Sequence, residues 1–98
     1  MRRSKLEMYV GILSVLAQRG PLKLTHVMYK ANVNCSVLGE YLSFLLEKEL
    51  VEERIVQKGR KVYAITQRGI TVLKYFGELK QALPIGAEEE QRQVPPLF

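Results

Sequence analysis

The stretch VEERIVQKGRKVYAIT, residues 51–66, decides how this 98-residue chain folds. Branched and aromatic residues alternate with polar ones on both sides of a glycine-containing link, a pattern typical of two half-buried strands joined as a hairpin. Four cationic side chains surround the link: Arg54, Lys58, Arg60 and Lys61. An isolated hairpin is only marginally stable in water, so another segment of the chain must pair with it.

The first twenty residues predict an amphipathic helix. Ser4 and Glu7 have the spacing of a capping box, in which each side chain bonds the other residue's backbone N–H. Apolar residues then recur every three or four positions as far as Ala17. Gly20 and Pro21 end the helix, because glycine favours the position after a helix and proline cannot continue it.

The next segment predicts a short strand and a short helix. Residues 22–24 alternate apolar and polar side chains, enough for a single edge strand that pairs with the hairpin. Thr25 is the expected N-cap of a helix over residues 26–31.

A turn and a longer helix come next. Residues 32–34 have the composition of a turn, and Asn34 can cap the following helix through its side-chain carbonyl. Apolar residues on one face continue this helix to about Lys48. Two helices joined by a three-residue turn, the second one longer, predict a helix-turn-helix.

A last helix is predicted over about residues 67–83, with Thr66 as its N-cap and Pro84 as its end. A glycine in the middle of this helix suggests close approach of a second helix. We therefore predict a homodimer in which the last helices pack across a two-fold axis. The residues expected at that contact are Ile70, Leu73, Phe76, Gly77, Lys80 and Leu83.

The predicted order is α-β-α-α-β-β-α, a mostly helical winged helix-turn-helix whose wing is the hairpin. We assign residues 1–83 to one domain that includes the dimerisation helix. Residues 84–98 carry three consecutive glutamates and two consecutive prolines but little to bury, and we expect this tail to be disordered.

Charge is distributed unevenly along the chain. Residues 1–83 hold 14 lysines and arginines against 7 glutamates, whereas residues 84–98 hold one arginine against three glutamates. The basic body favours a polyanionic partner such as nucleic acid, although a basic surface also serves solubility alone.

Several other classes of protein are disfavoured. No apolar run approaches the roughly 18 residues of a membrane span, and the N-terminus lacks a signal-peptide cleavage site. The single cysteine, Cys35, fits a reducing compartment, so we expect a cytoplasmic, nucleoid-associated protein. One histidine (His26), one cysteine and no aspartate provide neither a metal site nor a catalytic triad. We expect no enzyme activity, cofactor, small-molecule ligand or membrane partner.

Three motifs resemble the small archaeal winged-helix DNA-binding proteins, which include chromatin-associated proteins and predicted transcriptional regulators. They are LKLTHVMYKAN at residues 22–32, YLSFLLE at residues 41–47 and YAITQRG at residues 63–69. The resemblance implies binding to double-stranded DNA as a homodimer, often through an antiparallel coiled coil of the last helices. Two features depart from that pattern: Pro84 keeps the last helix short, and the second helix of the helix-turn-helix is poor in cations.

The longer helix of the helix-turn-helix is the predicted recognition helix, whose first turns would face the major groove. Its outward side chains include two serines that can bond base or phosphate and a valine that can meet a thymine methyl group. The glycine there permits close backbone approach, and the glutamate repels phosphate. The candidate contacts on this helix are Ser36, Val37, Gly39, Glu40 and Ser43. Weak sequence readout is expected from such a set.

Affinity is therefore expected from lysines and arginines that contact phosphates. Gly59 lets the wing turn adopt a positive φ, so that cations on and beside the tip can lie along a minor groove. The predicted phosphate contacts are Arg54, Lys58, Arg60 and Lys61 of the wing, with Lys23, Lys30, Arg2 and Arg3 elsewhere. Charged hairpins also occur simply because they block edge-to-edge aggregation.

Two further interpretations stay open. Exposed Val37 and Phe44 on a cation-poor helix also suit a protein-interaction module of a transcription assembly. Cys35 begins the recognition helix, where a thiol could sense redox state, but a small semi-buried residue is the favoured interpretation. The DNA target, and the choice between an operator-bound regulator and an architectural protein, do not follow from the sequence.

Overall fold

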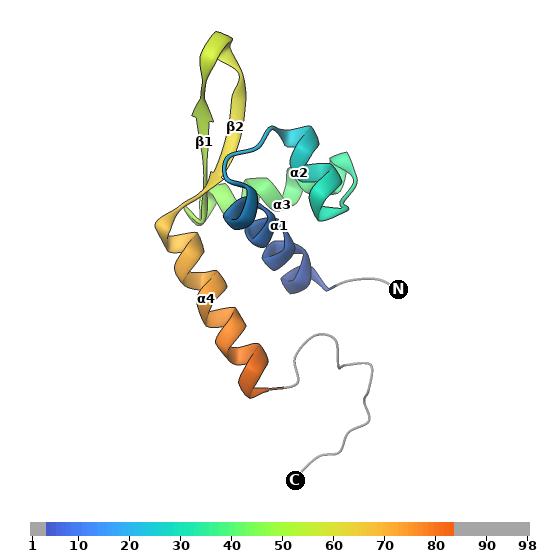
Figure 1. The fold of residues 1–98 in the computed structure, drawn as a ribbon. Helices are drawn as coiled ribbons and strands as arrows, with labels where there is room; N and C mark the ends of the chain where they lie inside the picture. Colours follow the sequence, from blue (N-terminus) through green and yellow to red (C-terminus); the bar gives the residue numbers. More distant parts are fainter. Residues whose placement is uncertain (1–3, 84–98) are drawn as a thin grey trace.

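The computed structural model describes residues 4–83 (Figure 1). Three helices form a body, from which a two-stranded antiparallel hairpin and a fourth helix extend in opposite directions (Figure 1). The order confirms the predicted winged helix-turn-helix. In sequence, the elements are α1 (Lys5–Arg19), α2 (Leu24–Ala31), α3 (Cys35–Glu47), β1 (Val51–Ile55), the one-turn 3₁₀ helix η1 (Gln57–Gly59), β2 (Lys61–Ile65) and α4 (Gln67–Ala82).

The predicted capping box begins α1. The Ser4 hydroxyl accepts a hydrogen bond from the Glu7 backbone N–H at 3.1 Å, and the Ser4 N–H donates to the Glu7 carboxylate at 3.0 Å. At the other end, Gly20 has φ 83° and its N–H donates to the Leu16 carbonyl at 2.9 Å. Both ends of α1 were thus predictable from neighbouring residues.

The core lies where α1, α2 and α3 meet the base of the hairpin. Its largest fully buried side chains come from all four elements, and no polar side chain of residues 4–83 is buried with them. These core residues are Ile12, Leu13 and Leu16 of α1, Val27 of α2, Leu38 and Leu45 of α3, and Val51 of β1. Burial of this apolar surface fixes the three helices around the hairpin base.

The predicted strand over residues 22–24 is reduced to one bridge. Leu22 and Tyr63 exchange two backbone hydrogen bonds, of 3.0 and 2.8 Å, which joins this segment to β2. Lys23 then serves as N-cap of α2, and Leu24 is already helical. The prediction of Thr25 as N-cap was therefore wrong, because the chain turns into the helix directly after the bridge.

The hairpin, or wing, pairs Val51 with Ile65 at its base and Ile55 with Lys61 near its tip. Beyond the strands, the Val56 N–H donates to the Arg60 carbonyl at 2.8 Å and closes the turn. Gly59 has the predicted positive φ, 71°, and Lys58 shares the left-handed region with φ 59°. Two such residues in succession turn the chain sharply at the tip.

Helix α4 begins at a tightly locked junction. The Thr66 hydroxyl accepts from the Gly69 N–H at 3.0 Å and donates to the Glu49 carbonyl at 2.7 Å. Gly69 is the only buried residue of α4, and a Cβ there would overlap the Leu50 carbonyl oxygen. Beyond this turn α4 contacts α1 and then extends away from the body (Figure 1).

Candidate nucleic-acid interface

The start of α3 is organised by Asn34. Its side-chain oxygen accepts from the Val37 N–H at 3.0 Å, which confirms the predicted N-cap. The Ser36 hydroxyl also donates to this oxygen, at 3.1 Å. The hydroxyl proton of Ser36 is therefore engaged within the protein, and its oxygen lone pairs are what it offers to a partner.

Four of the five predicted contacts on α3 are exposed: Ser36, Gly39, Glu40 and Ser43. Val37 is half-buried against the core. A Cβ at Gly39 would meet no atom within 4 Å, so this part of the helix surface is open. The whole of α3 contains two glutamates and no lysine or arginine, and its outer face therefore supplies shape and hydrogen-bond acceptors but no cation.

An aromatic cluster holds α3 against α1. The Tyr9 ring stacks on Phe44 with centroids 4.7 Å apart and meets the edge of Tyr41 at 5.0 Å. Lys48 lies with its ammonium 5.6 Å from the Phe44 ring centroid. The two ring contacts join α1 to α3 and help to fix the angle at which α3 is presented, whereas the Lys48 contact lies within α3 and its C-cap. Phe44 itself stays 38% exposed.

The two strands of the wing are electrically balanced. Arg54 bonds the Glu52 carboxylate at 2.8 Å, and the Lys61 ammonium lies 3.7 Å from that of Glu53. All four side chains are roughly half exposed, so these pairs contribute little to stability and can exchange partners. Two of the four cations predicted for phosphate are thus already paired in the free protein.

The tip of the wing keeps its charge. Lys58 and Arg60 are exposed, and within residues 4–83 neither forms an ion pair. Beside them lie two aliphatic side chains that the sequence pattern did not single out as contacts: Ile55, 65% exposed, and Val56, 42% exposed. Neither side chain is covered, because they lie at the end of the hairpin that projects from the body.

The remaining predicted cations are divided. Lys23 and Lys30 are exposed at the two ends of α2. Arg2 and Arg3, like the tail at residues 84–98, lie outside the described residues. Cys35 is exposed, which corrects the expectation of a semi-buried residue, because it occupies the first turn of α3, away from the core.

The face of α4 predicted for dimerisation is only partly free. Leu73 packs against the core of its own chain and Phe76 is half-buried, whereas Ile70, Gly77, Lys80 and Leu83 are exposed. A continuous apolar stripe runs along a neighbouring face of the helix and meets the predicted face at the C-cap, Leu83. Its members recur at three- and four-residue spacing and are 37–59% exposed: Val72, Tyr75, Leu79 and Leu83. The sequence shows that spacing. It does not show which of the two apolar faces of α4 is covered by α1.

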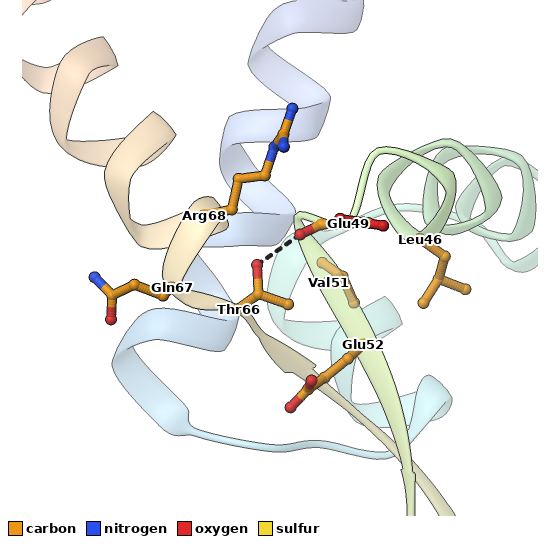
Figure 2. Close-up of a pocket in the computed structure, with 7 residues that line it drawn as sticks. All are labelled: Leu46, Glu49, Val51, Glu52, Thr66, Gln67 and Arg68. Carbon is orange, nitrogen blue, oxygen red and sulfur yellow. Dashed lines mark hydrogen bonds between the residues drawn. The ribbon is translucent and has the colours of Figure 1, made fainter.

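A hollow of about 530 Å³ lies where α3, β1 and α4 meet (Figure 2). Two of its lining residues are joined by the hydrogen bond from the Thr66 hydroxyl to the Glu49 carbonyl. Its seven lining residues are Leu46, Glu49, Val51, Glu52, Thr66, Gln67 and Arg68. The lining mixes both signs of charge with apolar surface and defines no single kind of ligand.

Residues 4–83 contain neither a cluster of metal-binding side chains nor a membrane-spanning helix. No three histidine, cysteine or acidic side chains gather as a metal site would require. None of the helices described has both the length and the apolar character needed to span a bilayer.

Comparison with known proteins agrees with this geometry. Residues 2–83 match the sequence profile of a family described as winged helix-turn-helix. Among solved structures, RV1404 from Mycobacterium tuberculosis has a TM-score of 0.71 at 23% identity over 90% of this chain. A MarR family transcriptional regulator from Silicibacter pomeroyi DSS has a TM-score of 0.70 at 19% identity over 92%. No curated protein matches the chain.

A third similar structure is a cysteine-to-serine mutant of Lactococcus lactis ZitR, with a TM-score of 0.67 at 17% identity over 76% of this chain. The alignments span 60%, 58% and 52% of the three solved chains, respectively. At these identities the likeness establishes the fold.

Proposed function

The chain belongs to the winged helix-turn-helix family, and we propose that it is a transcription regulator that binds double-stranded DNA as a homodimer. The observation that carries this proposal is the wing, whose tip presents two cations, unpaired within the described residues, on a hairpin that projects from the body. The shared fold with the Silicibacter pomeroyi MarR family regulator supports it.

The wing would act as the main phosphate clamp. Lys58 and Arg60 approach a polyanion without first leaving a partner among residues 4–83, and release of DNA counterions then drives binding. Arg54 and Lys61 follow once phosphate competes with Glu52 and Glu53. Lys23 and Lys30 add charge on α2. Affinity would consequently depend strongly on salt.

Helix α3 would contribute fit more than sequence readout. Ser36 offers its oxygen lone pairs to a donor on a base. The exposed Ser43 can donate to base or phosphate, and the open surface at Gly39 allows the backbone to approach a groove. Glu40 disfavours phosphate nearby. Without arginine for guanine or glutamine for adenine, α3 would discriminate poorly among sequences.

The test is a gel-shift titration with a random-sequence duplex at several salt concentrations. We expect micromolar or tighter binding at low salt, with a logarithmic slope of affinity against salt corresponding to several phosphate contacts. Absence of binding at micromolar protein and low salt would overturn the proposal.

The dimer would form through α4. The stripe of Val72, Tyr75, Leu79 and Leu83 leaves apolar surface on a helix that already extends from the body, and a second copy of the same stripe is its natural complement around a two-fold axis. Light scattering should give the dimer mass at tens of micromolar protein. A monomer mass there would contradict this assignment.

A second candidate function is a protein-interaction module of a transcription assembly. Exposed Phe44 on the cation-free α3 favours it. The same duplex titration separates the two functions, because this alternative predicts no salt-dependent DNA binding.

A second experiment distinguishes a regulator from an architectural protein. Random duplexes that the protein retains are selected and sequenced. Enrichment of a palindrome indicates an operator-bound regulator, and no enrichment indicates a chromatin-associated architectural protein. For either role we expect the protein in the cytoplasm, at the nucleoid.

A further inference from the structure

We propose that the wing bends DNA by inserting an aliphatic wedge, Ile55 and Val56, into the minor groove. This inference rests on the proposed DNA binding and adds an activity to it: deformation of the duplex. Its starting point is that the most exposed large aliphatic side chain of residues 4–83, Ile55 at 65%, ends the strand that leads into the turn with Lys58 and Arg60. Neither of these two cations forms an ion pair within those residues.

The wedge is fixed in position by the hairpin. Ile55 pairs with Lys61 across the strands, and the Val56 N–H bonds the Arg60 carbonyl at 2.8 Å. Val56 follows β1 with an extended backbone, φ −108° and ψ −163°. Because successive extended residues point to opposite faces, we infer that the two aliphatic side chains project on opposite sides of the ribbon. Ile55 is therefore at the level of Lys61, whose charge is paired with Glu53, and Val56 is at the level of Arg60, which forms no ion pair within the described residues.

The distribution of charge along the wing favours entry of its tip, and not of its strands, into the minor groove. Along the strands, Glu52 and Glu53 are each paired with a cation, so this part of the wing is neutral and offers phosphate little attraction. At the tip, Lys58 and Arg60 are unpaired within the described residues and can bind the phosphates on the two sides of a groove. A polyanion is thus drawn to the level at which Ile55 and Val56 are exposed.

The dimensions of B-DNA mean that the wing tip cannot enter the minor groove without deforming the duplex. The minor groove is about 6 Å wide, while the two strands of a hairpin are already about 4.8 Å apart before side chains are added. The tip fits only if the groove widens. Aliphatic side chains stabilise a widened, partly unstacked base step by covering it, and such wedges bend the duplex toward the major groove.

The experiment uses a random-sequence duplex of about 30 base pairs, far shorter than the persistence length, with a donor and an acceptor dye at its ends. A 2-aminopurine base in the duplex reports unstacking in parallel. We expect binding of the full chain to raise energy transfer and 2-aminopurine fluorescence together. The wedge is then replaced in the double variants Ile55→Thr/Val56→Thr and Ile55→Ala/Val56→Ala.

Threonine keeps the branched shape that strands favour, so the first variant retains the hairpin while removing apolar surface. Both variants should bind DNA with the salt slope of the wild type but about tenfold more weakly, because the cations remain and only wedge burial is lost. With both variants bound, energy transfer and 2-aminopurine fluorescence should stay near the values of free DNA. Leu6→Ala, which truncates an aliphatic side chain 50% exposed on α1, should leave binding and bending unchanged.

The outcomes separate the two proposals. Wild-type binding without a rise in energy transfer, or equal bending by the variants, overturns the wedge and leaves DNA binding intact. Failure of the wild type to bind duplex at low salt overturns both.

Discussion

The wing and α4 both extend from the helical body, in opposite directions, and both expose aliphatic side chains (Figure 1). Their surroundings differ. The exposed aliphatics of the wing lie beside Lys58 and Arg60, whereas Val72, Tyr75, Leu79 and Leu83 continue an apolar stripe along α4 to its C-cap. The two extensions are equally unburied, yet they are suited to chemically different partners.

The comparison teaches that exposure alone does not identify a partner. An apolar stripe at helical spacing is best covered by a similar stripe, since each side chain then meets apolar surface. The wing of a second protein molecule would cover Ile55 and Val56 poorly, because the cations beside them would be brought close to cations of the same kind. Charge is therefore the reason why we propose a protein partner for α4 and a polyanion for the wing. Four predictions test that division.

The largest effect is expected at the junction from which α4 departs. Gly69→Ala should lower the free energy of unfolding by about 3 kcal/mol, because the added methyl overlaps the Leu50 carbonyl oxygen and the Ile65 side chain. Thermal denaturation followed by circular dichroism should show a midpoint lower by roughly 10 to 20 °C. An unchanged midpoint would mean that α4 is not locked to the body as the structure has it.

The second prediction concerns the α4 stripe. Leu79→Glu should weaken dimerisation at least about a hundredfold, because a two-fold contact loses two leucines and gains two charges. Sedimentation measures the dimer dissociation constant. The matched control is Gln81→Glu, which adds the same charge to the opposite side of the exposed helix. Equal effects of the two variants would show that charge alone, and not the stripe, governs association.

The third prediction concerns the wing tip. Lys58→Ala and Arg60→Ala should each lower the salt slope of duplex binding by about 1 and weaken binding several-fold, since each removes one phosphate contact. Lys74→Ala removes an exposed charge from α4 and should change neither quantity. A slope that stays at the wild-type value in both wing variants would remove the tip from the interface.

Local signals account for what the sequence predicted well. Ser4, Asn34 and Thr66 each cap a helix through a residue only three positions away, and Gly20 and Gly59 have the positive φ that their turns require. Such features depend on neighbours along the chain and are readable without a fold. The winged helix-turn-helix followed from their order.

Features that depend on register or on docking angle were less accessible. The pairing of Arg54 with Glu52 and of Lys61 with Glu53 depends on the strand geometry. It distinguishes these two wing cations from Lys58 and Arg60, which form no ion pair within the described residues. Likewise, the angle at which α4 meets α1 buries part of the Leu73 face and leaves the Leu79 face open. Both distinctions arise from tertiary contacts, which residue spacing does not specify.

The smallest expected effects come from two open glycines, one on α3 and one on α4. A Cβ would meet no atom within 4 Å at Gly39 or at Gly77, so alanine at either position should raise the free energy of unfolding by about 1 kcal/mol through helix propensity. Only Gly39→Ala should weaken duplex binding, by a few-fold, because its methyl would separate the α3 backbone from the groove. Thermal denaturation and duplex titration of the two variants measure both effects. Equal DNA affinity for the stabilised variants would place the α3 face away from the duplex and leave the wing as the contact that remains to carry binding.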